Sequence, residues 1–571
     1  MRNSEIAQIF QDIADILEIK GENPFRVRAY HKIVRILETL PEEIEKVCQR
    51  GELRNIPGVG EGLAKKIEEL LATGKLAYYE DLKKQVPSGL VELLAIPEIG
   101  PKTVSLLYKE LGINNVRELE KAVKEHRLKD LPGMGPKTEE NIRRGIELLK
   151  KKQGRMLLGR AYPLAQSIIE RLGGLPEVDR ISLAGSLRRM RETIGDIDIL
   201  VASRKPRRVM QVFTELPGVT EILSIGETKS SIIMEENLQV DVRVVEPDSF
   251  GAALQYFTGS KPHNIKLREI ANKRGLKINE YGVFEIKSGE KISGQTEEEV
   301  YATLDLSYIP PELREERGEI EAAQEGKLPH LVELRDIQGD LHVHSRWSDG
   351  SDSIRELAEA AGKRGYRYMA VCDHSQSLKV AGGLSVDERW KQIEEIRKIN
   401  KELKNFRVLA GAEVDIHSDG SLDYEDELLK ELDIVIAAIH SGFKQNREIM
   451  TGRVVRAMEN RFVHIIAHPT GRLLHEREPY QVDVETLVRE ARRTGTFLEL
   501  NAFPERLDLN DIHCRQAKEA GVMVALGTDA HHQGQMEMMP YGVATARRGW
   551  LEKKDILNTL SLKDLLKRLK G

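Results

Sequence analysis

The stretch that decides the fold is Gly185-Ser186-Leu187-Arg188-Arg189, followed by Gly195-Asp196-Ile197-Asp198-Ile199-Leu200. The apolar run around the two aspartates predicts a strand over 194–201. Because side chains at i and i+2 of a strand leave from the same face, we expect Asp196 and Asp198 to point the same way. Two carboxylates this close repel each other. A divalent cation such as Mg²⁺ removes the conflict, since it takes oxygen ligands and bridges carboxylates to phosphates.

A third carboxylate, Asp241, lies on the next predicted strand, over 238–243. Three carboxylates that converge on two metal ions are what in-line phosphoryl or nucleotidyl transfer requires. The turn that begins at Gly185 offers backbone N–H groups and guanidinium groups that could hold a triphosphate. A lone Asp-x-Asp pair more often faces solvent on a half-exposed strand. The turn before the pair and the third aspartate after it favour catalysis.

The Gly-Ser turn before Asp-x-Asp resembles the nucleotidyltransferase superfamily. Within it, Tyr256-Phe257-Thr258-Gly259-Ser260, with Asn264 and Arg268 beyond, resembles the family X DNA polymerases, the polymerase beta group. The resemblance implies that Asp196, Asp198 and Asp241 hold Mg²⁺ or Mn²⁺, and that Asp241 receives the primer 3′-hydroxyl proton. It implies nucleotide binding by Gly185, Ser186, Arg189, Gly195, Tyr256, Phe257, Gly259 and Asn264, and template contact by Arg268. Taken alone, the two aromatic residues would more often be core residues.

Composition describes a multidomain protein without a membrane segment. The 571 residues predict three to five domains, with 40% hydrophobic and 31% charged residues and a net charge of -5. No run of about 18 apolar residues is present, and the first 20 residues form an amphipathic pattern rather than a signal peptide. Cys48, Cys372 and Cys514 lie far apart, which favours a reducing cytoplasm over a disulfide framework.

A short unit occurs three times near the N-terminus, at 56–60, 96–100 and 131–135, and each copy precedes a predicted helix. Turn glycines let a ligand approach the backbone, and the following helix N-terminus favours a phosphate. One copy could be a plain turn between helices, but three favour binding of a phosphodiester backbone. The units resemble helix-hairpin-helix motifs, which implies DNA contact, with Na⁺ or K⁺ at the motifs. The glycines that carry this expectation are Gly58, Gly60, Gly100 and Gly135.

Lys66 lies on the helix after the first of these units, eight residues beyond Gly58. In family X members with lyase activity, a lysine at the matching position forms a Schiff base with an abasic sugar, and Lys65 could help lower the pKa of that amine. The alternative is a phosphate-binding or solvated lysine on a helix rich in lysines. Arg26 stands where the family often has a lysine.

The C-terminal part alternates apolar runs with helical stretches, which predicts a barrel of parallel strands with helices outside. The strand-like runs are 339–344, 368–374, 407–416, 433–440, 463–468, 496–501 and 522–529. Nine metal-ligand side chains fall at or just past the ends of these runs, where such barrels place active sites. They are His342, His344, Asp349, His374, Glu413, His440, His468, Asp529 and His531.

Imidazoles with bridging carboxylates suit Zn²⁺, Mn²⁺ or Fe²⁺, and nine ligands are too many for one ion. We expect two or three ions, with Glu413 as the bridge, able to activate water and clamp a phosphodiester. Any one histidine alone would more often be structural. The set resembles the polymerase and histidinol phosphatase (PHP) domain, which implies phosphoesterase activity. A purely structural metal cluster and a small-molecule phosphatase remain as alternatives.

The order of parts resembles bacterial and archaeal family X DNA polymerases with a C-terminal PHP domain. The expected fold is multidomain α/β: helical helix-hairpin-helix domains, an α+β polymerase beta-like palm and a distorted (β/α)7 barrel. The expected segments are a small helical domain over 1–85, a DNA-binding domain over 86–154, the palm over 155–245, a nucleotide-selection domain over 246–317, a charged linker over 318–335 and the PHP domain over 336–571.

By this resemblance the protein fills short gaps in base excision repair, and the PHP domain acts as a metal-dependent 3′-5′ exonuclease. Cleavage at abasic sites or removal of 3′-phosphates are further expected activities of that domain. The expected partners of a monomer are gapped or nicked duplex DNA and deoxynucleoside triphosphates. The rival interpretation is a DNA-end scaffold that does not polymerise, which three intact carboxylates disfavour.

Overall fold

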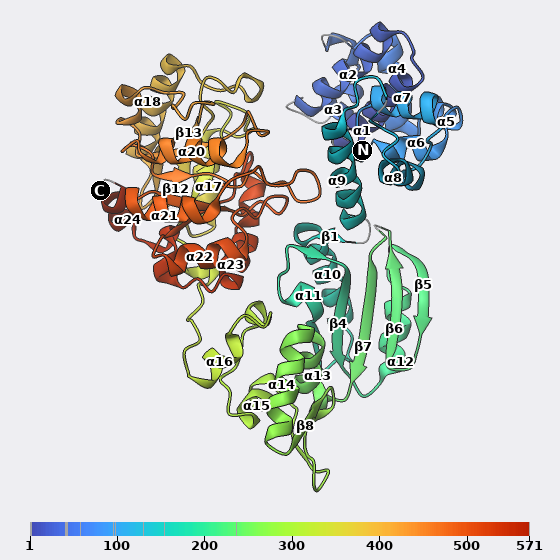
Figure 1. Cartoon of the computed structure of the whole chain (residues 1–571), viewed down its shortest axis with the longest axis vertical. Helices are drawn as coiled ribbons and strands as arrows, with labels where there is room; N and C mark the ends of the chain where they lie inside the picture. Colours follow the sequence, from blue (N-terminus) through green and yellow to red (C-terminus); the bar gives the residue numbers. More distant parts are fainter. Residues whose placement is uncertain are drawn as a thin grey trace. The chain divides into compact units, whose positions relative to one another are not determined.

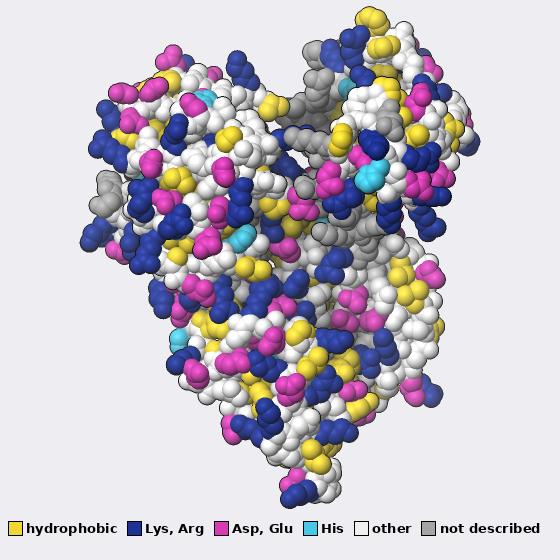
Figure 2. All heavy atoms as spheres, viewed as in Figure 1, with side chains coloured by type: hydrophobic (Ala, Val, Ile, Leu, Met, Phe, Trp, Pro, Cys, Tyr) yellow, Lys and Arg dark blue, Asp and Glu magenta, His cyan; other side chains and the backbone are white. Residues whose placement is uncertain are grey.

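The computed structural model describes residues 3–39, 44–56, 59–94, 96, 99–129, 131–152, 155–235 and 237–569. The chain divides into two compact units, Met1–Gln153 and Gly154–Gly571, drawn in Figure 1. Among those residues, no helix combines the length and the apolar character that a membrane crossing needs. The three cysteines are free thiols. On the face seen in Figure 2, basic and acidic side chains are mixed in both units.

The first compact unit is helical in the residues described, and it has two hydrophobic cores. Its elements are α1 (Asn3–Ile19), α2 (Pro24–Thr39), α3 (Ile44–Gln49), η1 (Leu53–Asn55), α4 (Glu61–Thr73), α5 (Ala77–Lys84), α6 (Ser88–Leu93), α7 (Pro101–Leu111), α8 (Val116–Lys124) and α9 (Pro136–Lys152). Phe10, Ile13 and Leu17, at helical spacing on α1, lie in the first core. Val104 and Leu107 of α7 lie in the second.

The second compact unit begins with a five-stranded sheet in the order β2-β4-β7-β6-β5. Its elements are β1 (Met156–Leu157), α10 (Leu158–Gly173), β2 (Arg180–Leu183), α11 (Gly185–Arg188), β3 (Thr193–Ile194), β4 (Asp196–Ala202), α12 (Pro206–Thr214), β5 (Val219–Ile225), β6 (Lys229–Met234) and β7 (Gln239–Val245). Ile197 and Ile199 of β4 pack with Val240 and Val242 of β7 in the core beneath α10 and α12. Because side chains alternate along a strand, the polar residues between them emerge on the opposite face.

A helical segment with a small sheet, β10-β9-β8, follows. Its elements are η2 (Pro247–Ser249), α13 (Phe250–Thr258), α14 (Lys261–Lys273), β8 (Leu276–Asn279), β9 (Gly282–Glu285), β10 (Lys291–Ser293), α15 (Glu297–Thr303), η3 (Pro311–Leu313) and α16 (Glu319–Gln324). Leu200 and Ala202, on the face of β4 that carries the aspartates, pack against α13.

The charged tract after residue 311 differs from the surface helix and linker that we expect from its composition. Arg314 and Glu319 are both fully buried. The Arg314 guanidinium pairs with Glu297 at 2.6 Å, and Glu319 lies 2.7 Å from Nδ1 of His263. The start of the predicted linker is therefore part of the core, because its charges find partners on α14 and α15.

The rest of this unit is a parallel barrel whose seven strands follow one another in sequence order, β11 to β17. The strands are β11 (Gly339–Val343), β12 (Tyr368–Val371), β13 (Arg407–Asp415), β14 (Ile434–Ala438), β15 (Ile465–Ile466), β16 (Phe497–Asn501) and β17 (Val524–Gly527). The surrounding helices are α17 (Ile354–Lys363), α18 (Val386–Glu402), α19 (Asp426–Leu429), α20 (Arg447–Met458), α21 (Val484–Thr494), α22 (Asp511–Glu519), α23 (Met539–Arg548) and α24 (Leu562–Leu569). A bridge between Val343 and Ala530 nearly closes the barrel. All seven predicted strands are present.

Candidate active sites

The three palm aspartates lie together on one face of two neighbouring strands, opposite the core beneath α10 and α12. Asp198 of β4 is the direct parallel partner of Asp241 of β7, and Asp196 stands two residues before Asp198 on the same face. Asp198 and Asp241 both line a small cavity of about 200 Å³, with Lys229, Arg243 and Phe257. The structure therefore brings together the three carboxylates that the sequence predicts as a metal site.

Gly185 explains why the motif begins with glycine. It adopts φ +59°, and a Cβ built there would lie 2.1 Å from Oδ2 of Asp198. An L-side chain would be strained in that conformation and would also collide with the carboxylate. The glycine thus lets the turn at the start of α11 approach the aspartates closely.

Charge repulsion shapes the ionisation of Asp198. Burial, with the neighbouring Asp196 and Asp241, raises its pKa to about 7. Asp241 behaves differently: burial raises its pKa, but hydrogen bonds from Gln239 and Lys229 outweigh burial and leave that pKa below its ordinary value. The Lys229 ammonium lies 3.0 Å from Asp241, where it partly supplies the positive charge that a cation would bring. A site of this kind fits divalent metal ions, because they would relieve the remaining repulsion.

The aromatic pair expected to select the nucleotide lies at the end of α13. The rings of Tyr256 and Phe257 meet edge to face with centroids 5.1 Å apart, and the Arg243 guanidinium lies over the Phe257 ring at 4.3 Å. Gly259 ends the helix with φ +67°, a conformation that favours glycine and bends the backbone after Thr258. Asn264 donates to the carbonyl oxygen of Tyr256 at 2.7 Å and thereby ties α14 to the pair.

The two arginines of the turn are held by the segment that follows the palm. Arg188 pairs with Glu297 at 2.6 Å. Arg189, the expected triphosphate contact, pairs with Glu315 at 3.1 Å and also donates to the carbonyl oxygen of Thr258. Ser186 and Gly195 are partly exposed beside them, and Arg268 is exposed on α14. The roles of these five residues stay predictions.

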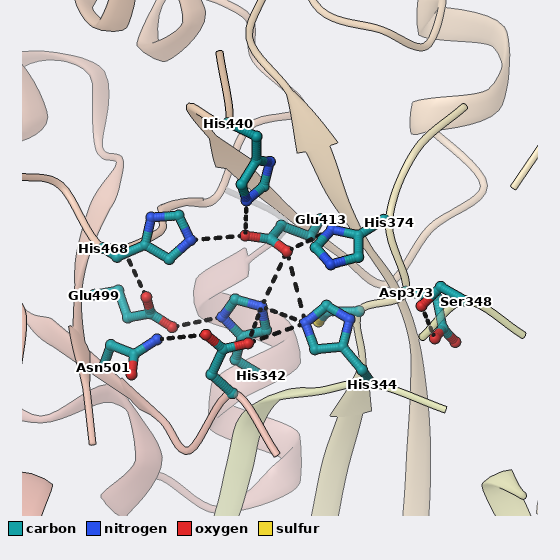
Figure 3. A network of polar contacts seen from close by, with 12 residues as sticks. His342, His344, Ser348, Asp373, His374, Glu413, His440, His468, Glu499 and Asn501 are labelled. Atoms are coloured by element: carbon teal, nitrogen blue, oxygen red, sulfur yellow. Dashed lines mark hydrogen bonds and ion pairs between the residues drawn. The ribbon is translucent and has the colours of Figure 1, made fainter. Parts of the chain in front are cut away.

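In the barrel, the nine predicted ligands converge at the carboxyl ends of the strands, as Figure 3 shows for its centre. Glu413 of β13, 1% exposed, lies in the middle. Its Oε1 is 2.9 Å from Nε2 of His468 and 3.3 Å from Nε2 of His440. Its Oε2 is 2.9 Å from Nδ1 of His374 and 3.6 Å from Nε2 of His342.

The remaining ligands extend the cluster around His344. Its Nε2 lies 3.2 Å from Asp529 and 3.1 Å from Nε2 of His342. Asp349 lies 3.4 Å from both His374 and His531. Three groups of these residues have ligand atoms close enough to share an ion: His344, Asp349, His374 and His531; His342, His344 and Asp529; and His374, Glu413 and His440.

The donor set fits divalent transition metals. Nδ1 of His344 and Nδ1 of His468 are buried without a hydrogen-bond partner. Buried nitrogen atoms of this kind are normally satisfied, so their lone pairs are free to serve as ligands. Imidazoles with shared carboxylates suit Zn²⁺, Mn²⁺ or Fe²⁺. The three groups share His344 and His374, and both the number and the identity of the ions stay predictions.

Comparison with known proteins identifies the family. Four family models match: a helix-hairpin-helix domain over 1–76, a SAM-like helix-hairpin-helix tandem over 90–147, the DNA polymerase beta thumb over 253–315 and the PHP domain over 340–502. The chain is 43% identical over 567 residues to the DNA polymerase/3′-5′ exonuclease PolX of Bacillus subtilis (strain 168), covering 99% of both chains. The chain belongs to the family X DNA polymerases that carry a PHP domain.

The barrel also resembles shorter proteins. A probable phosphatase of Thermoanaerobacter sp. (strain X514) is 29% identical over 231 residues, 38% of this chain and 89% of that protein. A probable phosphatase of Syntrophotalea carbinolica is 34% identical over 203 residues, 34% of this chain and 79% of that protein. The match to the polymerase beta thumb covers residues 253–315. This range includes Glu297 and Glu315, which pair with Arg188 and Arg189.

Sequence reasoning missed the residues that orient the metal ligands. Glu499 accepts from Nδ1 of His342 at 2.6 Å and from the backbone N–H of His468 at 2.6 Å. Asp415 accepts from Nδ1 of His440. Such partners fix the ring orientation and the tautomer of a ligand histidine. A signal existed, because Asp415 follows Glu413 at the i+2 spacing of one strand face.

Asp373, which precedes the ligand His374, does not lie among the metal ligands. It instead holds a neighbouring loop. It is fully buried and accepts from the Ser345 hydroxyl at 2.6 Å and from the Ser348 hydroxyl at 2.6 Å. Asn501, at the end of β16, donates to Asp529 at 3.1 Å. Both residues hold neighbouring ligands or loops in position.

The three repeated units near the N-terminus contain the same backbone hydrogen bond. The backbone N–H of Val59 donates to Ile56, that of Ile99 to Ile96 and that of Met134 to Leu131, at 3.0, 3.1 and 3.0 Å. Gly60 and Gly100 are the N-caps of the following helices with negative φ. Gly58 lies outside the described residues.

Neither backbone strain nor crowding requires glycine at the ends of these turns. A Cβ at Gly60, Gly100 or Gly135 would meet nothing within 4 Å. Space is therefore left at each position for a ligand to approach the backbone, as a phosphodiester chain would.

Lys66 lies among polar and aromatic neighbours on α4. Its Nζ is 5.0 Å from the centroid of the Tyr78 ring and 3.3 Å from the carbonyl oxygen of Gly62. Arg26 donates to the Tyr78 hydroxyl at 2.6 Å. Lys65 instead pairs with Glu61 on the exposed side of the helix, so its ammonium charge is partly balanced. A lyase role for Lys66 stays a prediction.

Proposed function

We propose that the protein is a DNA-directed DNA polymerase that fills short gaps in duplex DNA and carries a metal-dependent 3′-5′ exonuclease in its PHP domain. The observation that carries the proposal is the presence, in one chain, of opposed palm aspartates and of nine metal-ligand side chains at one end of a barrel. The full-length relative whose name gives both activities supports it.

In the palm, Asp196, Asp198 and Asp241 would hold Mg²⁺ or Mn²⁺, which supplies positive charge to the phosphates and to the attacking oxygen. By the family resemblance Asp241 would accept the proton of the primer 3′-hydroxyl. Hydrogen bonds from Gln239 and Lys229 keep that carboxylate ionised. Phe257 lines the same cavity as the carboxylates, so the sugar of a bound nucleotide would lie against the ring. These positions favour a deoxyribose, because a 2′-hydroxyl would need further room.

In the barrel, the nine ligands would hold two or three divalent ions, which supply Lewis acidity and a neutralising charge for a phosphodiester. Glu499 and Asp415 keep His342 and His440 turned toward Glu413 through their Nδ1 atoms. The ligands are therefore held ready for metal ions, and the reaction we propose for them is hydrolysis at a DNA 3′ end. Cleavage at abasic sites and removal of a 3′-phosphate use the same chemistry and are proposed as further activities.

The helix-hairpin-helix turns support binding of the DNA backbone without base reading, as gap filling in base excision repair requires. We place the downstream 5′-phosphate near Lys66 and propose Schiff-base chemistry with an abasic sugar at its amine as a further activity. Na⁺ or K⁺ at the turns and a monomeric state are also proposed.

The test is an assay on a duplex with a one-nucleotide gap, with Mg²⁺ or Mn²⁺, in the presence and absence of deoxynucleoside triphosphates. With nucleotides the primer should lengthen by one residue; without them, in Mn²⁺, it should shorten from its 3′ end. A protein that binds the gapped duplex but does neither would be the DNA-end scaffold.

A second candidate concerns the barrel alone and follows from its probable-phosphatase relatives. In that case the full-length protein would hydrolyse a small phosphate monoester, such as histidinol phosphate, faster than a DNA 3′ end. Comparing kcat/KM for the monoester and for a 3′-hydroxyl primer under the same Mn²⁺ conditions decides between the two.

A further inference from the structure

Two arginines from the PHP part of the chain contact the turn expected to bind the triphosphate and the residues just after it. Arg548, the last residue of α23, donates to the backbone carbonyl of Arg189 at 2.7 Å and pairs with Glu315 at 3.0 Å. Arg472 pairs with Glu192 at 2.7 Å. The side chains of Arg548 and Glu315 are 5% and 10% exposed, so their contact is largely removed from solvent. Arg472 is 9% exposed, but its partner Glu192 is 37% exposed.

Glu315 is the point at which these contacts meet. Its carboxylate lies 3.1 Å from Arg189 and 3.5 Å from Arg191, besides its contact with Arg548. Burial raises the pKa of Glu315, but Arg548, Arg189 and Arg191 outweigh burial and leave it below its ordinary value. Glu315 is therefore ionised, and its carboxylate orients the Arg189 side chain.

The network carries more positive than negative charge. Asp511 pairs with Arg548 at 2.7 Å and with Arg317 at 3.0 Å. Four guanidinium groups (Arg189, Arg191, Arg317 and Arg548) thus share the two carboxylates of Glu315 and Asp511.

The backbone between the two contacts is also unusual. Met190 adopts φ +53°, a left-handed conformation that is uncommon for a residue with a side chain. Residues in such conformations persist where the surroundings hold them in place. The Arg548 bond to the Arg189 carbonyl acts on the residue directly before it.

Apolar packing also joins the PHP part of the chain to the palm. Leu507 and Tyr541, both from the PHP part of the chain, are buried in the palm core. The Tyr541 ring meets Tyr162 of α10 edge to face at 6.3 Å. A Cβ at Gly159 would lie 2.5 Å from Pro504, so the backbone at Gly159 lies directly against the Pro504 ring.

We propose that Arg548 is a positioning residue of the polymerase site, through which the PHP domain sets the affinity of the palm for the incoming nucleoside triphosphate. It acts through Glu315 and the Arg189 carbonyl and does not itself touch the nucleotide. The inference rests on the proposed polymerase function.

The test compares Arg548→Met with Arg547→Met in the full chain. Arg547 is the matched control, because it lies on the same helix and pairs with Glu312 at 2.7 Å and with the Val332 carbonyl at 3.0 Å, away from the turn. For Arg548→Met, single-nucleotide gap filling should show a KM for the nucleotide raised about tenfold, with kcat changed less than about threefold. Arg547→Met should stay within about twofold of wild type, and Mn²⁺-dependent exonuclease activity should persist in both variants.

Equal KM values for the two folded variants would overturn the proposal. If Arg548→Met does not fold, as a thermal melt would show, Arg548→Lys keeps the charge but loses the second donor, and it should give an intermediate KM. If wild type extends no primer, the proposed function fails instead. The inference is then judged on the Kd of a non-hydrolysable deoxynucleoside triphosphate, which should still weaken about tenfold in Arg548→Met.

Discussion

Asp198 and Asp241 are directly opposed partners on the parallel strands β4 and β7. Without cations their repulsion is only partly relieved, by the ammonium of Lys229 at 3.0 Å from Asp241. Burial and the two neighbouring aspartates together raise the pKa of Asp198 to about 7. The metal-free site therefore destabilises the folded protein at neutral pH. The three carboxylates repel each other unless metal ions are bound between them.

Burial of Asp198 and repulsion by its two neighbours together predict a pH-dependent gain in stability for Asp198→Asn. An ordinary aspartate has a pKa near 3.9 when unfolded, so the folded protein binds the extra proton between about pH 4 and pH 7. Stability then falls as pH rises through that window and stays low above it. At pH 8 without metal, Asp198→Asn should melt about 4 °C above wild type, for a difference of ~2 kcal/mol.

At pH 4 the two melting temperatures should coincide, and Mg²⁺ should raise that of wild type alone. Glu221→Gln, on the exposed strand β5 of the same sheet, is the control and should change neither. A stability gain that is equal at both pH values would show that repulsion is not its cause.

Loss of one palm carboxylate should abolish synthesis only. Asp196→Asn is expected to reduce nucleotide addition about a thousandfold, equivalent to ~4 kcal/mol of transition-state stabilisation. Exonuclease activity in Mn²⁺ should stay near wild type, because the barrel uses its own ligands. The measurement is extension and shortening of the same labelled primer in a gapped duplex.

His440→Ala should show the opposite pattern. His440 lies 3.3 Å from Glu413 and is oriented by Asp415, so its loss removes a ligand from one of the three groups. Primer shortening should fall at least about a hundredfold, while gap filling in Mg²⁺ continues. Intact nuclease activity in this variant would mean that the barrel site has been assigned wrongly.

Much of both sites was predictable because ligands follow the period of their strands. His342 and His344, and Asp196 and Asp198, stand two residues apart on one face, and the apolar runs around them mark the strands. Glu499, in contrast, lies in an apolar run with no metal ligand two residues away. Its role in orienting His342 is visible only from their contact in the structure.

The buried charges of the thumb could not be predicted for a different reason. Arg314 and Glu319 occur in a tract that is charged throughout, which is typical of exposed segments. Their partners, Glu297 and His263, lie on helices earlier in the chain. Pairing across such distances in sequence leaves no local pattern, so burial appears only once the fold is known.

The open glycines of the repeated turns predict a loss of DNA binding without a loss of stability. Gly100 caps α7 with φ -95°, and a Cβ at this position would meet no atom within 4 Å. Gly100→Ser introduces a favourable N-cap residue and should not lower the melting temperature. It should weaken binding of duplex DNA several-fold, as measured by fluorescence anisotropy, because the side chain occupies the space of a phosphate. Lys109→Ser, at the other end of the same helix, is the control, and equal affinities for the two variants would contradict the assignment.

Proton competition at the barrel predicts that metal binding strengthens with pH. Burial lowers the pKa of His374 and His440, but Glu413 and other carboxylates outweigh burial and raise these values to about 10 and about 9. Below pH 9 the metal-free protein therefore holds protons on both imidazoles, and an ion must displace them. Between pH 7 and 9, the apparent Kd for Mn²⁺ should therefore fall with rising pH. If binding releases one proton, the Kd should fall about tenfold for each pH unit, and each further proton released adds another factor of about ten for each unit. Calorimetry in two buffers of different ionisation enthalpy counts those protons, and His440→Ala should release one fewer. A Kd that does not vary with pH would show that these rings are already neutral.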